Sequence, residues 1–312
     1  MNKYFWFSNY RLSLALAGPA TTAFVILMLT PYEMGIYYVF SQLLLFTLSF
    51  ELSCGILITQ SMGKIVRETN YDGNIITLDI EDRSYFQKIE SFSKTLSKII
   101  PILSFLISWP IGYYVLESTS NSDYQFHWFL FVTFMSIGLL IQIYTSKLEG
   151  YGNVALAQKI RLFSQIIRVL FLWFALVLGL KIYSLVISSL FAFVSYFFVY
   201  KFYIKKINHN FLDGNTLVSV DINSKINHQI LITFSNLFGN FIMRNLLVVI
   251  VFYNIGAEIA GPLGLSIVLL EHIFIASLIP IQANLAKISR DTSLGLNKGN
   301  LLQKSLISLM LF

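Results

Sequence analysis

Charged side chains are scarce in this chain of 312 residues. Only 12% of the residues are Asp, Glu, Lys or Arg, whereas 56% are hydrophobic and 16% are aromatic. An ordinary soluble domain carries roughly a quarter charged residues and about half apolar ones. With this composition, and a mean hydropathy of +0.68, a soluble globule would have too little polar surface to cover its apolar interior. The sequence therefore indicates an integral membrane protein and excludes a disordered chain or a coiled coil.

Cysteine is nearly absent, since Cys54 is the only one, and a disulfide-stabilised scaffold is excluded. The sequence also lacks a Gly-rich phosphate loop followed by Lys and Ser or Thr. Its four histidines are scattered along the chain: His127, His209, His228 and His272. Glu271 precedes His272, but adjacent helix positions are expected to face different ways and lack metal-ligand spacing. We therefore expect no metal, no cofactor and no catalytic constellation, so the protein is not predicted to be an enzyme.

Long apolar runs dominate the chain, and about 20 mostly apolar residues in a helix cross a membrane. The first run is too long for a cleavable signal peptide, contains Pro19 and is followed almost at once by a second run. A last run begins near Ser305 and reaches only Phe312, so we expect a fragment of a longer protein. The complete runs are Leu12–Leu29, Ile36–Ile58, Ile99–Leu116, Phe126–Thr145, Leu162–Leu180, Tyr183–Tyr200, Ile230–Tyr253 and Leu263–Ala283.

The basic residues predict the orientation of these spans. If the N-terminus is cytoplasmic, every one of the 22 Lys and Arg residues lies on the cytoplasmic side except Lys181, Arg168 and Arg244. This is the positive-inside pattern of a multi-pass membrane protein, and it explains the net charge of +6 without nucleic acid. His127 and Trp128 open one run at its outer end, where amphipathic rings are expected at the interface.

A polar stretch divides the chain into two groups of spans. Residues 204–229 lie in the most polar run of the chain, which contains Asn208, Asn210, Asp213, Asn215, Asp221 and Asn223, and we expect them to form a cytoplasmic linker. We expect an N-terminal six-helix lobe over residues 1–203 and the start of a second lobe over residues 230–312. The fold class predicted is thus an all-α, multi-pass membrane bundle.

Four charged residues lie inside apolar runs, where charges are costly and often functional: Glu51, Arg168, Arg244 and Glu271. The side chain of Arg168 could equally reach back to the cytoplasmic interface. Glu51 and Glu271 could be counter-ions to a buried Arg, protonatable coupling groups, or neutral acids with a raised pKa.

Arg244 lies near the middle of its run and has polar neighbours on one helix face. Thr233, Asn236, Asn240 and Arg244 follow each other at spacings of three or four residues. Such a face must look into a polar cavity or against another helix. Hydrogen bonds between packed helices would explain the asparagines, but they explain a central guanidinium poorly.

Three segments of the chain carry a further signal. The first is LTPYEMGIYYVFS at residues 29–41, and the second is FELSCGILITQ at residues 50–60. The third is LEGYGNVA at residues 148–155, followed by KIR at residues 159–161. Together these segments resemble a known family, the Wzx-type O-antigen flippases, with Ser53 in place of the family's usual Gly. The resemblance runs in order along most of the chain.

This resemblance implies a polysaccharide-biosynthesis transporter with the two-lobe helical bundle of the MATE-like flippase superfamily. Such proteins translocate undecaprenyl-diphosphate-linked oligosaccharides across the inner membrane, alongside a polysaccharide polymerase and a chain-length regulator. Arg244 and Arg168 would then bind the diphosphate, and Asn240, Asn236 and Thr233 the sugar hydroxyls. Glu51 or Glu271 would bind a coupling ion or act as counter-ion.

Two alternatives remain open at this point. One is a cation-coupled multidrug antiporter of the same fold, in which the acids bind substrate and the arginines are structural. The other is a membrane polysaccharide polymerase or acyltransferase, although the outer loops are short for either enzyme. Because the family has further C-terminal helices, we expect residues 1–312 alone not to support polysaccharide export.

Overall fold

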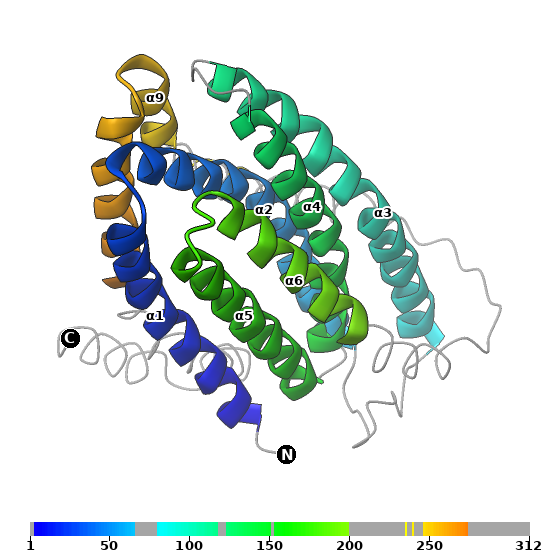
Figure 1. The fold of residues 1–312 in the computed structure, drawn as a ribbon. Coiled ribbons are helices and arrows are strands. Elements are labelled where there is room, and N and C mark those ends of the chain that lie inside the picture. Colours follow the sequence, from blue (N-terminus) through cyan, green and yellow to red (C-terminus); the bar gives the residue numbers. More distant parts are fainter. Residues whose placement is uncertain are drawn as a thin grey trace, which may run out of the picture.

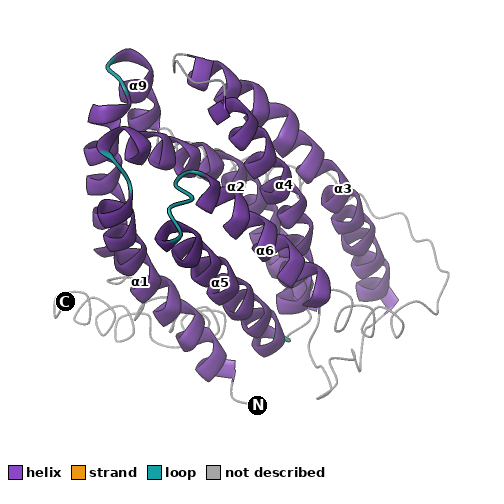
Figure 2. Cartoon of the chain, viewed as in Figure 1, coloured by secondary structure: helices purple, strands orange, loops and turns teal. Residues whose placement is uncertain are grey.

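The computed structural model describes residues 3–65, 80–117, 123–150, 153–199, 235, 239 and 246–273. Within these ranges the regular secondary structure is helical (Figure 1 and Figure 2). One helix, over residues 257–273, carries no label in Figure 1 and is called the 257–273 helix below. The labelled helices are α1 (Lys3–Met28), α2 (Pro31–Ile65), α3 (Ile80–Glu117), α4 (Asp123–Gly150), α5 (Val154–Val177), α6 (Tyr183–Val199) and α9 (Leu246–Asn254).

The predicted apolar runs are helical almost throughout wherever the structure describes them. Three of the described helical stretches are long and apolar enough to cross a membrane: Ile89–Glu117 within α3, Asp123–Gly150 (α4) and Val154–Val177 (α5). Shorter apolar stretches are Leu12–Met28 within α1 and Tyr183–Ser195 within α6. The linker at residues 204–229 and the run from Ser305 to Phe312 lie outside the described residues, so the division into lobes stays a prediction.

The connection between the apolar runs Ile36–Ile58 and Ile99–Leu116 is partly helical, because α2 continues to Ile65 and α3 already begins at Ile80. In this extension Ile89, Ser93 and Ser97 are buried and recur every four residues, which lines them up on one helix face. Two of these residues are serines, so the buried face carries no apolar periodicity that the sequence would reveal.

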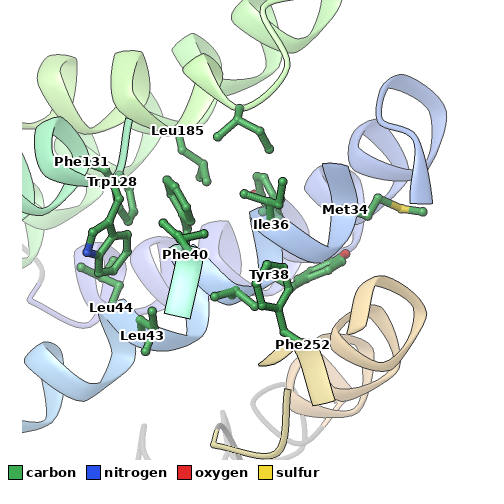
Figure 3. Close-up of a cluster of buried hydrophobic side chains, with 14 of the residues drawn as sticks. Met34, Ile36, Tyr38, Phe40, Leu43, Leu44, Trp128, Phe131, Leu185 and Phe252 are labelled. Carbon is green, nitrogen blue, oxygen red and sulfur yellow. The ribbon is translucent and has the colours of Figure 1, made fainter. Parts of the chain in front are cut away.

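The interior of the bundle is built around aromatic side chains of α2 and α4 (Figure 3). Phe40 packs edge-on against Trp128, with ring centroids 5.0 Å apart, and lies 5.8 Å from the ring of Phe131. Large apolar side chains on the outside of the bundle are instead exposed, among them Leu106 and Phe174. An apolar interior together with an apolar exterior is the arrangement of a helix bundle surrounded by lipid.

Trp128 is fully buried, so its ring packs inside the protein and does not contact lipid. Its indole N–H donates to the carbonyl oxygens of Ser108 and Trp109, both at 3.2 Å, on α3. The ring lies against Gly112, where a Cβ would come within 2.1 Å of it. The tryptophan therefore joins α3 to α4 inside the protein.

Small residues bring the 257–273 helix close to α2. A Cβ at Gly261 would lie 2.7 Å from the carbonyl oxygen of Pro31, and one at Gly264 would lie 2.6 Å from the Cβ of Tyr38. Gly35 on α2 meets the backbone of Ala257 in the same way. Close backbone approach through small residues is typical of helix packing in membranes.

An ion pair joins the α1–α2 turn to the α5–α6 turn at one end of the bundle. Glu33 and Thr30 form a reciprocal cap at the start of α2, and the Nζ of Lys181 lies 2.7 Å from Glu33 Oε1. Burial raises the pKa of the Glu33 carboxyl, but hydrogen bonds from Lys181 and Thr30 outweigh it and hold this pKa below its usual range. The hydrogen bond between Lys181 and Glu33 raises the pKa of the Lys181 ammonium group.

At the α4–α5 turn a denser cluster of polar side chains joins these two helices. Glu149 Oε1 accepts hydrogen bonds from Arg161 Nη1 at 2.5 Å and from Gln158 Nε2 at 2.6 Å. Nearby, Lys147 is buried and its Nζ lies 2.8 Å from Glu90 Oε1 on α3. The third flippase-like segment therefore forms part of a helix junction. Which end of the bundle faces the cytoplasm stays a prediction.

Candidate functional site

A cavity of about 320 Å³ lies between the helices. Its walls come from α1, α2, α4, α5, α6 and the 257–273 helix. This volume is at the lower end of the roughly 300–1,000 Å³ of small-molecule sites. The apolar part of the lining includes Val25, Phe131 and Leu172. The polar lining residues are Thr21, Thr22, Tyr37, Tyr38, Ser41, Gln42, Gln165, Arg168, Ser188, Ser189, Glu271 and His272.

Arg168 lies well inside α5 and lines this cavity. Its Nη2 donates to Gln165 Oε1 at 3.0 Å, one helical turn earlier, which holds the guanidinium along the inner face of the helix. The first turns of α5 carry their own basic residues, Lys159 and Arg161, nearer the helix end. The cavity therefore holds a cation at a depth where a charge is costly without an anion or polar groups around it.

Glu271 and His272 line the same cavity from the 257–273 helix. Adjacent positions on a helix point 100° apart, so the two side chains face different ways, as expected, and both still border the cavity. The His272 ring is tethered through Nδ1 to the carbonyl oxygen of Val268 at 2.6 Å. It lies over Gly18 on α1, where a Cβ would come within 1.8 Å of the ring.

The cavity brings together two of the predicted site residues, Arg168 and Glu271. The backbone of Glu51 is part of α2, but its side chain lies outside the described residues, and so do the remaining predicted site residues: Thr233, Asn236, Asn240 and Arg244. The roles predicted for them remain predictions. Among the described residues, no group of three or more His, Cys, Asp or Glu side chains could hold a metal ion.

Most polar residues of the cavity were missed by the sequence reasoning, and Tyr38 and Gln42 are two of them. Both are buried, at 2% and 0% exposure, on the inner face of α2. A signal was available, since Tyr38 lies in the first flippase-like segment and Gln42 directly follows it inside an apolar run. Tyr and Gln are common enough in membrane helices that this signal did not stand out.

Solved structures with a similar fold are transporters. An inward-facing conformation of a multidrug resistance MATE family transporter of the MOP superfamily has a TM-score of 0.59 and 12% identity, over 97% of this chain and 69% of that one. An outward-facing conformation of a transporter with the same description has a TM-score of 0.58 and 13% identity, over 92% and 70%. No protein-family model matches the chain, and no curated protein sequence matches it. The chain thus has the helical fold of the MATE transporters, as predicted.

Proposed function

We propose that this protein is a membrane transporter that carries a lipid-linked oligosaccharide, attached through a diphosphate, across the membrane by way of the central cavity. The observation that carries the proposal is Arg168, a permanent cation that lines a cavity together with hydroxyl, amide and apolar side chains inside an apolar helix bundle. The neighbours of the same fold are described as transporters, which agrees with transport and not with an enzyme.

The physical argument is that a diphosphate does not cross hydrocarbon unaided. Moving an anion out of water costs far more than a protein can recover from packing, unless a cation and hydrogen bonds replace its hydration shell. An arginine offers several N–H donors in a planar fork that suits phosphate oxygens. Arg168 would supply such a partner in the cavity, and the predicted Arg244 would add a second.

The substrate class follows from the lining and from the flippase-like segments. A sugar chain needs many hydrogen-bonding partners, and the cavity has hydroxyls and amides on most of its helices. We therefore take the substrate to be an undecaprenyl-diphosphate-linked oligosaccharide, such as an O-antigen repeat unit, in a bacterial inner membrane. In that setting a polysaccharide polymerase and a chain-length regulator would act on the product.

A second candidate function is a cation-coupled multidrug antiporter. It is favoured by Glu271, which lines the cavity and could bind a cation, and by the description of the structural neighbours as multidrug transporters. In this case the positive charge of Arg168 would repel the substrate, since both are cations. The polymerase or acyltransferase alternative has no comparable observation in its favour.

Equilibrium binding to the purified protein in nanodiscs separates the two candidates. We expect the undecaprenyl-diphosphate oligosaccharide to bind, and Arg168→Ala to weaken this binding roughly 10- to 100-fold, the value of a hydrogen-bonded charge. Arg168→Lys should retain part of the affinity because an ammonium still holds phosphate as a point charge. Lys94→Ala, which removes a half-exposed lysine on α3, is the control and should change nothing.

The antiporter candidate makes the opposite prediction. The lipophilic cation tetraphenylphosphonium would bind, Glu271→Gln would abolish its binding, and the lipid-linked oligosaccharide would bind no better to wild type than to Arg168→Ala. That result would overturn the flippase proposal.

A further inference from the structure

Gln42 and Tyr38 have polar ends without a hydrogen-bond partner. In the part of the chain that the structure describes, neither the Nε2 nor the Oε1 of Gln42 has one, and the Tyr38 hydroxyl has none either. Both side chains are more than nine-tenths buried, and both line the central cavity. They lie four residues apart on α2, so they share one helix face.

Other polar residues of the same cavity are already satisfied by the protein. Ser41, Ser188 and Ser189 each donate to a carbonyl oxygen one turn earlier in their own helix, at 2.9, 2.9 and 2.7 Å. Thr21 accepts the indole N–H of Trp173 at 2.9 Å, and Gln165 accepts from Arg168. The unpartnered groups are therefore not a general property of this lining.

A buried amide or hydroxyl without a partner destabilises the empty protein, because its hydrogen bonds to water are lost and not replaced. Buried polar groups are nearly always paired, and exceptions require an explanation. At the wall of a cavity the simplest explanation is a ligand that supplies the missing partners.

We infer that Gln42 and Tyr38 form a hydroxyl-binding subsite for the sugar directly attached to the lipid diphosphate. This inference rests on the proposed function, whose anion partner Arg168 lines the same cavity. The amide of Gln42 offers an acceptor and two donors, and the phenol of Tyr38 is both donor and acceptor. Neighbouring hydroxyls of a sugar ring present the same alternation of donor and acceptor.

The subsite is also suited in size and position to a single sugar. The cavity is small for a whole lipid-linked oligosaccharide, so the diphosphate and the first sugar are the parts that it would hold. Tyr38 is fixed from the other side by Gly264 of the 257–273 helix, where a Cβ would come within 2.6 Å of the tyrosine Cβ. Its ring is therefore held in place before any ligand binds.

The test compares two probes, undecaprenyl diphosphate and undecaprenyl diphosphate carrying one N-acetylglucosamine, on the same protein in nanodiscs. We expect wild type to bind the glycosylated lipid more tightly. Tyr38→Phe and Gln42→Met should each reduce this preference roughly three- to tenfold, the value of one hydrogen bond, and leave affinity for the bare lipid unchanged. Arg168→Ala should weaken the binding of both lipids.

Matched controls come from a tyrosine and a glutamine outside the cavity. Tyr114→Phe removes a hydroxyl that pairs with Tyr253 at 3.0 Å, and Gln158→Met removes an amide that donates to Glu149. Neither should change the preference for the sugar. Thermal unfolding adds a second readout: Gln158→Met should lower the Tm, whereas Gln42→Met should keep or raise it, because it removes buried groups that have no partner.

The inference is overturned if wild type binds both lipids equally, or if Tyr38→Phe and Gln42→Met keep the preference of wild type. In both cases binding that depends on Arg168 would leave the proposed function standing. A Gln42→Met variant that loses as much Tm as Gln158→Met would likewise overturn it, since Gln42 would then be structural. Binding of neither lipid would refute the proposed function and this inference together.

Discussion

Glu149 is the residue whose removal should most clearly destabilise the junction between α4 and α5. Its carboxylate accepts from Arg161 at 2.5 Å and from Gln158 at 2.6 Å, and the side chains of Glu149 and Arg161 are only 15% and 17% exposed. Glu149→Ala removes the carboxylate acceptor of a largely buried guanidinium and of a buried amide. Arg161 keeps a weaker neutral acceptor, the Thr145 hydroxyl at 3.3 Å from its Nε. The Oε1 of Gln158 has no hydrogen-bond partner within the described residues.

The magnitude follows from these contacts. A hydrogen bond to a charged group contributes about 1.5–3 kcal/mol, and breaking a fully buried pair costs about 3–5 kcal/mol. Because Arg161 keeps some access to water, we expect Glu149→Ala to lower the free energy of unfolding by about 2–3 kcal/mol. Glu149→Gln should cost less, since its amide oxygen still accepts one of the bonds.

The assay is unfolding by SDS in mixed micelles, followed by circular dichroism, on a double-mutant cycle of Glu149→Ala and Arg161→Ala. The coupling energy should be about 1–3 kcal/mol, because the second substitution removes the charge that the first leaves unpaired. Glu117→Ala, at an exposed carboxylate, should change stability by less than about 0.5 kcal/mol. Additive effects of Glu149→Ala and Arg161→Ala would refute the reasoning.

Three other predictions concern packing, pH and topology. Gly18→Ala should destabilise the protein by about 1–3 kcal/mol, because the new Cβ would come within 1.8 Å of the His272 ring. Adding His272→Ala should restore most of this loss of stability. A Gly18→Ala variant with wild-type stability would contradict the prediction. The lowered pKa of Glu33 stabilises the fold above its ordinary value near 4, and this contribution is lost as pH falls through the lowered folded pKa. Tm should therefore fall at acidic pH, and Lys181→Met should weaken this dependence of Tm on pH. If Tm falls equally with pH in the variant and the wild type, the ion pair does not stabilise the fold. A reporter fused after Ser120 should read external, and a cytoplasmic signal there would reverse the predicted orientation.

The helices were predictable because each apolar run must satisfy its backbone hydrogen bonds internally in lipid, and a helix does so within one segment. The helical extension of α3 before Ile99 was not predictable, because its buried face includes Ser93 and Ser97 and a charged pair, Glu90 with Lys147, holds it to α4. Such a face carries no apolar periodicity, so the segment looked like a loop.

Only the charged residues of the candidate site were predictable from the sequence. Arg168 and Glu271 stood out because a charge inside an apolar run requires a reason. Their location around one cavity depends on how α5 and the 257–273 helix pack against α1 and α2, which depends on close contacts such as Gly18 with His272. Gln42 is uncharged, so only its lack of a partner in the folded protein identified it.

The most direct test of the central claim is to map where the substrate lies. An undecaprenyl-diphosphate oligosaccharide with a photoreactive group on its first sugar would be cross-linked to the protein in nanodiscs, and the labelled peptides identified by mass spectrometry. If the cavity binds the substrate, labels are expected on α2 around Gln42 and on α5 around Arg168, and they should be lost in Arg168→Ala. Labels confined to the exposed outer side chains, such as Leu106 and Phe174, and unaffected by Arg168→Ala, would contradict it.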